Sequence, residues 1–193
     1  MIRGFTLIEL MVAVSIFAIV MMVGVGALLT MVEANKRAQG INQVSNNLNA
    51  AVEQMSRSIR VGSTYYCGDT AVPPSPLVLT QPRDCPNNGG LLFAFEATGG
   101  DPDDIGDQVV FRLNGTQLER SLESGANGTW VALTAPEVQI SNFRFYVTGS
   151  TPLAGGDTEQ PRVLMIIRGV AELQGVQTDF TVQSSVTQRL IDI

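Results

Sequence analysis

Histidine is absent from this 193-residue sequence, and Lys36 is its only lysine. The first absence removes the commonest general base and the commonest zinc ligand, and the second removes nearly every Schiff-base mechanism. The sequence also contains no phosphate-binding loop and no HExxH motif. We therefore expect a protein that is not an enzyme. A membrane-anchored periplasmic enzyme that uses a lone Asp or Ser is an alternative that no motif supports.

Cysteine is scarce as well. Cys67 and Cys85 are the only two, and their spacing differs from the CxxC pairs of zinc and redox sites. In an oxidising compartment they would form one disulfide that closes the loop 67–85 and stabilises the fold by about 3 kcal/mol in the chain-entropy model. The alternative is two free thiols in a cytosolic fold. The export signal described below favours the disulfide.

Positive charge is rare in the C-terminal two thirds of the chain. Residues 62–193 contain fifteen acidic residues and seven arginines, which gives this region a net charge of about −8. An acidic surface repels the phosphates of nucleic acids. We therefore expect no nucleic-acid partner.

A long uncharged stretch runs from Leu10 to Val32, over 23 consecutive residues. As a helix it would span about 35 Å, and the hydrocarbon core of a bilayer is about 30 Å thick. No small-residue cleavage site follows it, so we expect it to be retained as a membrane helix. Glu9 lies at its edge. From the residues alone, an interfacial acid that snorkels or is protonated would explain Glu9.

The residues that surround Glu9 favour a more specific interpretation. Residues 3–10, RGFTLIEL, resemble the processing site of type IV prepilins and pseudopilins. The resemblance implies that prepilin peptidase removes a leader of residues 1–4 by cutting between Gly4 and Phe5, and that Phe5 is then N-methylated. It also implies that Glu9 pairs with the N-terminal amine of a neighbouring subunit. Pairing is physically reasonable, because two opposite charges in apolar surroundings cost less together than alone.

The same resemblance implies partners and a location. The partners would be other major and minor pilins or pseudopilins, together with the prepilin peptidase. The protein would cross the inner membrane once, with its head in the periplasm, and would then move to the tip of a pilus or pseudopilus. We expect a minor subunit that joins a tip or priming complex of a type IV pilus or a type II secretion pseudopilus. A tip binding module, for adhesion or DNA uptake, is the alternative.

One feature departs from the family pattern. Major pilins often carry a proline about two thirds of the way along the apolar helix, and this chain has Gly24 and Gly26 in that neighbourhood. Glycine costs about 1 kcal/mol relative to alanine inside a helix, so these residues could mark a melted or bent segment. Close packing against another helix is the other interpretation.

Helical periodicity continues beyond the apolar stretch. Apolar residues recur every three or four positions, which predicts one apolar helix face; they are Ile41, Val44, Leu48, Val52, Met55 and Ile59. Gly62-Ser63 is a helix stop signal. We expect one helix over residues 5–61, with a transmembrane or filament-core half at 5–32, an amphipathic half at 33–61, and a β-rich head at 62–193.

The head is predicted to be an antiparallel β-sheet packed on this helix, so the fold class is α+β, the pilin fold. The segment 63–90 is rich in Pro, Asn and Gly and is predicted to be a loop with a short strand near 77–79. Asn114-Gly115 and Gln174-Gly175 predict two hairpin turns. Further strands are predicted at 91–96, 109–113, 117–121, 129–133, 138–147, 162–173 and 177–188.

A second, looser resemblance lies in the head. The run Asn-Gly-x-x-Leu-Glu-Arg at 114–120, Trp130, and the strand with Phe143, Phe145 and Tyr146 look like the J-type minor pseudopilins and the PilW-like minor pilins. This second resemblance is the one that favours a minor subunit.

Acidic residues cluster in one place, at Asp101, Asp103, Asp104 and Asp107, with Glu96 nearby. Calcium prefers several carboxylate and carbonyl oxygens on a flexible loop, and some pseudopilin heads bind calcium. The spacing lacks the glycine and the terminal glutamate of an EF-hand loop. A solvated turn that keeps a sheet edge soluble is the alternative, and we expect no other cofactor.

Overall fold

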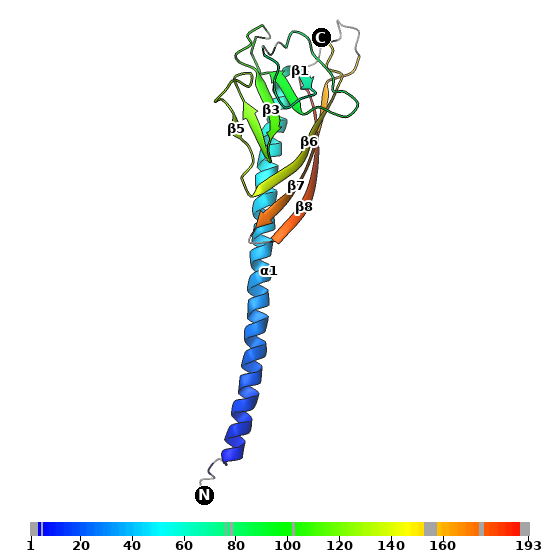
Figure 1. Cartoon of the computed structure of the whole chain (residues 1–193). Helices are drawn as coiled ribbons and strands as arrows, with labels where there is room; N and C mark the ends of the chain where they lie inside the picture. Colours follow the sequence, from blue (N-terminus) through cyan, green and yellow to red (C-terminus); the bar gives the residue numbers. More distant parts are fainter. Residues whose placement is uncertain are drawn as a thin grey trace. The chain divides into compact units, whose positions relative to one another are not determined.

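A computed structural model describes residues 4, 6–75, 77, 79–101, 103–152, 158–173 and 176–189. Contacts divide the chain into two compact units, Met1–Asn42 and Gln43–Ile193. Within the described part there are one helix and eight strands (Figure 1). Their bounds are α1 Leu7–Val61, β1 Ser63–Gly68, β2 Leu92–Glu96, β3 Val109–Asn114, β4 Gln117–Ser121, β5 Val131–Ala132, β6 Val138–Thr148, β7 Arg162–Leu173 and β8 Val176–Thr187.

The predicted single long helix is confirmed. α1 contains 55 residues and runs through both Gly24 and Gly26, so neither glycine melts the helix in this structure. It ends at Val61, directly before the predicted stop signal. Phe5, where we expected the helix to begin, lies outside the described residues.

The predicted α+β class is also confirmed, and the β-structure forms two sheets. One sheet has the order β1-β2-β3-β4-β5 and the other the order β6-β7-β8, and every pairing in both is antiparallel. An isolated antiparallel bridge between Gly90 and Phe145 connects them. Its two backbone hydrogen bonds measure 2.8 and 3.0 Å.

The strand prediction failed at β1. Residues 63–68 were assigned to a loop, yet Ser63–Gly68 pairs with β2 and buries Tyr65 and Cys67. The Pro- and Gly-rich composition begins only after this short strand, which explains the error. Leu77 and Leu79 are buried without forming the predicted strand, and Val78 lies outside the described residues. β5 is shorter than predicted, with only Val131–Ala132.

The amphipathic half of α1 packs on the sheets through the predicted face, with one exception. Val44, Leu48, Met55 and Ile59 are buried, and Val52 is partly buried against the same core. Ile41 is 49% exposed and does not belong to this core. Each fully buried aliphatic side chain contributes about 1.5–3 kcal/mol. This helix face therefore supplies a large part of the stability of the head.

Six aromatic rings fill the space between the helix and the sheets, and all are buried: Tyr65, Phe93, Phe95, Phe111, Phe143 and Phe145. The predicted inward side chains of β6, Phe143, Phe145 and Val147, are among the buried residues. A bulge between Ile140 and Asn142 shifts the alternation by one residue. Ile140 and Phe143 are three positions apart, so in a regular strand they would face opposite sides of the sheet. Because of the bulge, both face the core.

Two hairpins were predicted from turn residues. β3 and β4 pair up to Asn114 opposite Gln117, so the hairpin is present but its two-residue turn is Gly115-Thr116, one residue later than the predicted Asn114-Gly115. Gly115 has a φ of 59°, and a type II′ turn requires such a value at its first central position. β7 and β8 pair up to Leu173 opposite Val176, and the turn residues 174 and 175 lie outside the described residues.

The last carbonyl groups of α1 are all hydrogen-bonded by the head. The hydroxyl of Tyr65 donates to the carbonyl of Ile59. The carbonyl of Arg60 accepts from the backbone N–H of Arg189 at 2.8 Å, and that of Val61 accepts from the hydroxyl of Thr98 at 2.8 Å. Such terminal carbonyls have no partner inside a helix. The adjacent strand β1 and two more distant segments of the head thus hold the end of the helix.

Gly62 has a packing role beside its role as a stop signal. A Cβ atom at this position would lie 2.2 Å from Cδ2 of Phe95, whose ring is buried. Gly62→Ala should therefore destabilise the head by about 1–3 kcal/mol, as overpacking does elsewhere. Thermal unfolding of the full-length protein in detergent, followed by the fluorescence of Trp130, measures this change. Gly24→Ala is the matched control, since nothing lies within 4 Å of a Cβ there; equal unfolding temperatures for the two variants would contradict the prediction.

Candidate functional site

The N-terminal segment begins with a capped helix. Thr6 precedes α1, and its hydroxyl oxygen accepts a hydrogen bond from the backbone N–H of Glu9 at 3.3 Å. Thr and Glu three positions apart are the residues of a capping box, and a carboxylate in the first turn interacts favourably with the helix dipole. Glu9 thus has a local role in starting the helix. The sequence analysis missed Thr6, although the T-x-x-E pattern could have identified it.

Of the two predicted processing residues, Gly4 and Phe5, the structure describes only Gly4. Gly4 is described and exposed, and Phe5 lies outside the described residues. The roles of Gly4, Phe5 and Glu9 in cleavage, methylation and assembly remain predictions.

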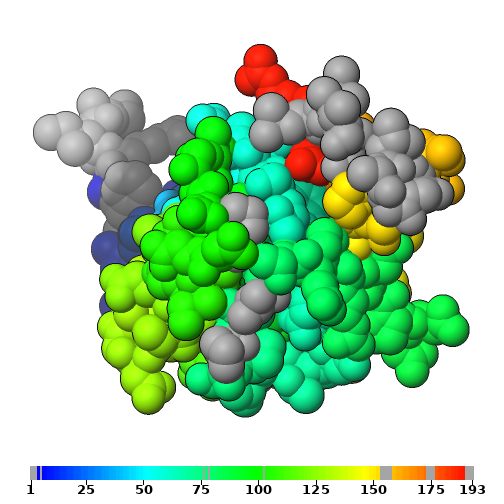
Figure 2. Space-filling view, turned by 90° about the horizontal axis from the view of Figure 1, so that it is seen from above, coloured from blue at the N-terminus to red at the C-terminus, as the bar shows by residue number. Residues whose placement is uncertain are grey.

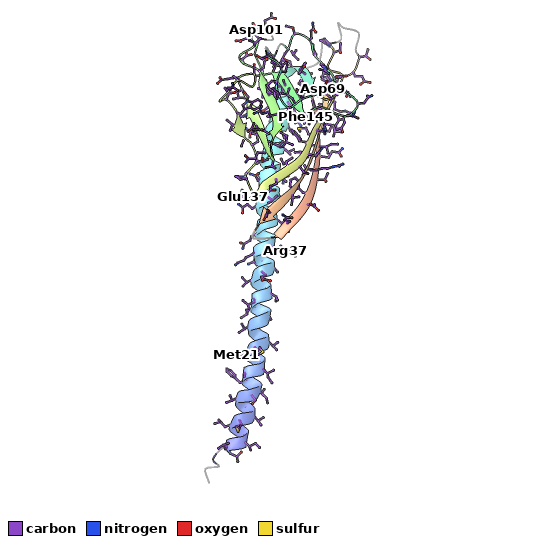
Figure 3. The ribbon with its side chains drawn as sticks, in the orientation of Figure 1. Met21, Arg37, Asp69, Asp101, Glu137 and Phe145 are labelled. Atoms are coloured by element: carbon purple, nitrogen blue, oxygen red, sulfur yellow. A yellow bond between two sulfur atoms is a disulfide. The ribbon has the colours of Figure 1, made fainter. Side chains whose placement is uncertain are left out.

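Over the described residues, the apolar side chains of the first half of α1 are exposed. Every large apolar side chain from Leu7 to Val32 is at least half exposed, with values from 50% to 78%. In Figure 3 the side chains near Met21 project from the helix on all sides. By length and composition, α1 is the one helix in the described part that could cross a membrane. Such a surface requires a bilayer or other apolar helices around it, which supports membrane anchoring.

The predicted disulfide between Cys67 and Cys85 is present. Cys67 lies in β1. The backbone N–H of Cys85 donates to the carbonyl of Val147 at 3.1 Å, and the N–H of Val147 donates to Sγ of Cys85 at 3.0 Å. Val147 belongs to β6, so the disulfide ties the five-stranded sheet to the three-stranded one. Gly90 packs directly on it, since a Cβ there would lie 2.2 Å from Sγ of Cys67.

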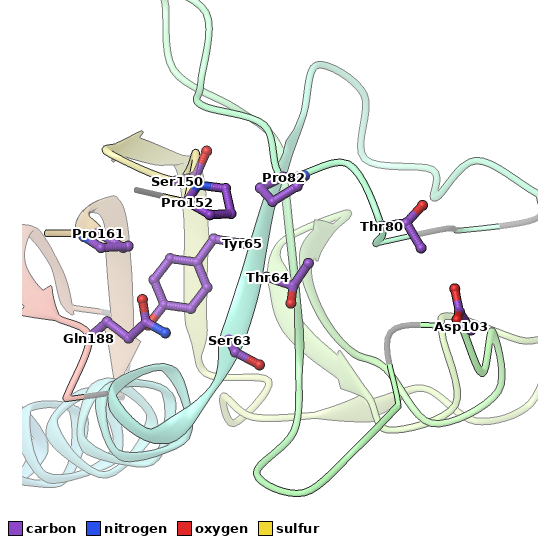
Figure 4. A pocket seen from close by; sticks show the side chains of 10 residues that line it. All are labelled: Ser63, Thr64, Tyr65, Thr80, Pro82, Asp103, Ser150, Pro152, Pro161 and Gln188. Carbon is purple, nitrogen blue, oxygen red and sulfur yellow. The ribbon is translucent and has the colours of Figure 1, made fainter. Parts of the chain in front are cut away.

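The four aspartates proposed for calcium do not form one group. Oδ1 of Asp101 accepts from the N–H of Asp103 at 3.0 Å, and Oδ1 of Asp104 accepts from the N–H of Gly106 at 2.9 Å, so both shape local turns. Asp103 lines a pocket of about 400 Å³ instead. Figure 4 shows Asp103 and Thr80 on the opposite side of this pocket from Gln188. Over the described residues, no three Cys, Asp or Glu side chains are arranged to hold a metal ion.

Glu96 was noted in the sequence only as a neighbour of this cluster, yet it is the most unusual acid of the head. It is 1% exposed, and among the described residues neither carboxylate oxygen has a well-aligned hydrogen bond, although the side chain of Asp107 and the backbone N–H of Ala97 interact with it. Oδ1 of Asp107 is also buried without a partner. Burial, followed by the nearby charge of Asp107, raises the pKa of Glu96 to about 7. The signal in the sequence was an acid that ends a fully buried apolar strand, LFAFE.

Three residues of the second resemblance, Asn114, Glu119 and Trp130, meet at one partly buried cluster. The guanidinium of Arg112 donates to Oε2 of Glu119 at 2.9 and 3.0 Å, and Asn114 donates to Oε1 of Glu119 at 3.1 Å. The same guanidinium lies 3.6 Å from the centre of the Trp130 ring. The sequence analysis missed Arg112, although Glu119 lies seven positions away and directly opposite it in the predicted hairpin of β3 and β4. The cluster borders a groove whose lining also includes Val72, Pro73 and Ile105.

Comparison with known proteins identifies one family model. Residues 1–25 match the prokaryotic N-terminal methylation motif. No curated protein and no solved structure matches the chain. The matched residues include Gly4, Phe5 and Glu9. The match supports a type IV pilin- or pseudopilin-type protein, a class that associates with other pilins and with the prepilin peptidase.

The disulfide should contribute substantially to the stability of the head. Its two cysteines are 18 positions apart, and loops of this length are stabilised by about 3 kcal/mol. Replacing both Cys67 and Cys85 with alanine should lower the free energy of unfolding by about that amount, as measured by urea titration. The wild-type protein with a reductant serves as the control and should match the double variant. A double variant as stable as the oxidised wild type would contradict this expectation.

Glu96 should make the stability of the head depend on pH. Its pKa rises from an ordinary value of 4.5 to about 7 in the folded protein, so the folded state binds the proton more tightly than the unfolded state. The stabilising effect is complete below pH 4.5 and is lost as the pH rises to about 7. In chelator-containing buffer, the contribution of Glu96 to the unfolding temperature should therefore fall between pH 4.5 and about pH 7. Above about pH 7 this contribution should stay constant.

The control for this pH dependence is Glu96→Gln, which has no titratable group. This variant should be more stable than the wild type at pH 8, because its amide can donate a hydrogen bond to Asp107. Subtracting its profile from that of the wild type isolates the contribution of Glu96. Parallel pH profiles for the two proteins would show that Glu96 does not titrate in this window.

Proposed function

We propose that this chain is a minor pilin or pseudopilin that joins a tip or priming complex of a type IV pilus or a type II secretion pseudopilus. The observation that carries the proposal is the first half of α1, whose large apolar side chains are all exposed and which begins within the N-terminal methylation motif. A monomer in water could not keep this surface exposed at low cost. In the membrane it is covered by lipid, and in a filament by the helices of other subunits.

Glu9 would set the register of assembly. Cleavage after Gly4 leaves Phe5 with a free amine, and Glu9 in a neighbouring helix lies at the edge of the apolar surface. Each charge is costly to bury alone, and the pair is much less so. An extending filament therefore favours the one axial position at which amine and carboxylate meet.

The head, residues 62–193, would select the neighbouring subunits. Support for a minor role comes from the resemblance at Asn114–Arg120, Trp130 and the β6 aromatics. Hydrogen bonds from Arg112 and Asn114 to Glu119, with Trp130 stacked on Arg112, bring Asn114, Glu119 and Trp130 of this resemblance together, whereas Phe143 and Phe145 of β6 lie in the core.

A tip module for DNA uptake is less well supported, because the head carries a net charge of about −8. A gel-shift assay with the full-length protein in detergent distinguishes this alternative. Retention of DNA at moderate salt would favour uptake over a purely structural subunit.

Processing provides the direct test of the proposal. Mass spectrometry of the protein isolated from its native membrane should find a chain that begins at Phe5 and carries one added methyl group. A chain that retains its leader and begins at Met1 would indicate a plain membrane anchor and would overturn the proposal.

Assembly should depend on Glu9. In Glu9→Gln, the amine of the neighbouring subunit loses its counter-ion in apolar surroundings, a loss of about 3–5 kcal/mol. The amount recovered in sheared filaments should therefore fall by about tenfold or more, while cleavage and membrane insertion continue. Glu33→Gln, which removes the other exposed acid in this part of α1, is the matched control and should assemble normally. Unchanged incorporation of Glu9→Gln would contradict the pairing.

A further inference from the structure

Most outer strand edges of the two sheets are covered or very short within the described part of the head. Arg83 borders β1, where its backbone makes two hydrogen bonds, of 2.9 and 3.0 Å, to Tyr65 and Cys67. β5, at the other end of the same sheet, has only two residues. Backbone hydrogen bonds join the outer edge of β6 to Thr116, Gly90 and Cys85.

The edge of β8 is the exception. All 12 residues of β8 pair with β7 without a bulge, and no segment of the described chain pairs with its other edge. In Figure 1 β8 lies beside β7 at the side of the head, and in Figure 2 the red residues that end the described chain reach the rim of the head. An open edge of this length presents a row of backbone donors and acceptors to the outside.

The register shows which residues of β8 present them. The N–H of Gln188 donates to the carbonyl of Pro161 at 3.0 Å, one step beyond the pair of Thr187 and Arg162. Because hydrogen-bonded and non-hydrogen-bonded pairs alternate along an antiparallel ladder, the odd-numbered residues from Gln177 to Thr187 direct their N–H and C=O groups away from β7. The side chains of these six residues are all exposed.

This edge also lacks the usual protection against pairing. Edge strands are commonly protected by lysine, proline, a bulge or an inward-pointing charge. β8 contains no lysine and no proline, its register has no shift, and its single charged residue, Asp179, is exposed. On its other face, Phe180 and Val182 are partly buried against the core. A strand placed beside β8 could therefore extend both the hydrogen-bonded ladder and the apolar face.

We propose that a neighbouring pilin-type subunit adds a strand to β8, so that the three-stranded sheet continues into the head of that neighbour. The added segment is extended, with apolar side chains beside Phe180 and Val182 and a lysine or arginine near Asp179. In such strand addition, main-chain hydrogen bonds give affinity and the alternate side chains give specificity. This inference rests on the proposed function, because it takes the partner from the same filament.

The direction of β8 argues against antiparallel pairing with a second copy. The N–H of Arg189, just after β8, donates to the carbonyl of Arg60 at the end of α1. The start of β8 lies level with the start of β6, close to Ala135, whose N–H donates to Asn47 at 3.1 Å. β8 thus runs in the same direction as this part of α1. Antiparallel pairing of two β8 strands would point the two helices in opposite directions, whereas subunits inserted in one membrane point the same way.

Parallel pairing with a second copy is unfavourable for a different reason. A two-fold axis along the strands would place each residue opposite the same residue of the other copy. Asp179 would then face Asp179, and like charges directly opposite each other destabilise a sheet. We therefore assign the edge to a different strand of a neighbouring subunit.

The test removes one outward N–H and leaves the ladder with β7 intact. Thr181→Pro does this, and proline is tolerated on an edge strand where the N–H faces outward. In detergent, the full-length variant should unfold within about 3 °C of the wild type. Its recovery in sheared filaments should fall by about tenfold or more, because the donor is lost and the ring blocks the added strand. Thr181→Ala, which keeps the N–H, is the matched control and should assemble as the wild type does.

Photo-cross-linking identifies the occupant of the edge. p-Benzoylphenylalanine at Gln183 should form an adduct in filaments with another chain that carries the N-terminal methylation motif, attached in its head. The control position is Asn142, which is exposed on β6 and separated from β8 by β7. It should not form this adduct. If Thr181→Pro does not fold, Gln183→Pro replaces it, with the same expected loss of assembly.

The outcomes separate this inference from the proposed function. A folded Thr181→Pro that is cleaved after Gly4 and enters filaments as well as the wild type would overturn strand addition alone. An adduct from Gln183 with a second copy of this chain, with a protein that has no methylation motif, or with nothing would do the same, as would an equal yield of the adduct from Asn142. A wild type that keeps its leader would overturn the proposed function and the inference with it.

Discussion

The apolar surface of α1 is the constraint on which the other features of this protein depend. Between Val44 and Ile59 this surface is covered by the two sheets of the head, and the buried aromatic rings fill the gap. Between Leu7 and Val32 its large apolar side chains are at least half exposed among the residues that the structure describes. The same physical force therefore acts twice, first to fold the head on the helix and then to place the helix in a membrane or a bundle of similar helices.

The head is held to α1 by connections that hydrophobic packing alone would not specify. The three terminal carbonyls of the helix accept hydrogen bonds from Tyr65, Thr98 and Arg189, which come from three separate segments. The Cys67–Cys85 disulfide and its hydrogen bonds to Val147 join the two sheets. Packing supplies most of the energy, and these directional bonds determine which single arrangement of helix and sheets is reached.

Glu9 and Glu96 are two acidic residues for which ionisation in apolar surroundings is unfavourable. Glu9 lies at the edge of an apolar surface and has only a local capping interaction through its backbone N–H. Glu96 lies inside the head, 1% exposed, beside the carboxylate of Asp107. An ionised carboxylate is unfavourable where water is scarce. For Glu9, the proposed amine of a neighbouring subunit would offset this cost. For Glu96, burial and the charge of Asp107 raise the pKa to about 7, so a bound proton offsets it at lower pH.

Sequence by itself determined the features that depend on local order along the chain. The uncharged stretch 10–32, the helical spacing of Val44, Leu48, Met55 and Ile59, and the turn at Gly115 all follow from neighbouring residues, because helix and hairpin periods are local. Only the tertiary structure decided that there are two sheets, that Ser63–Gly68 is a strand, and that Glu96 is buried beside Asp107. These features depend on which distant segments meet, and a single sequence does not encode that in any short pattern.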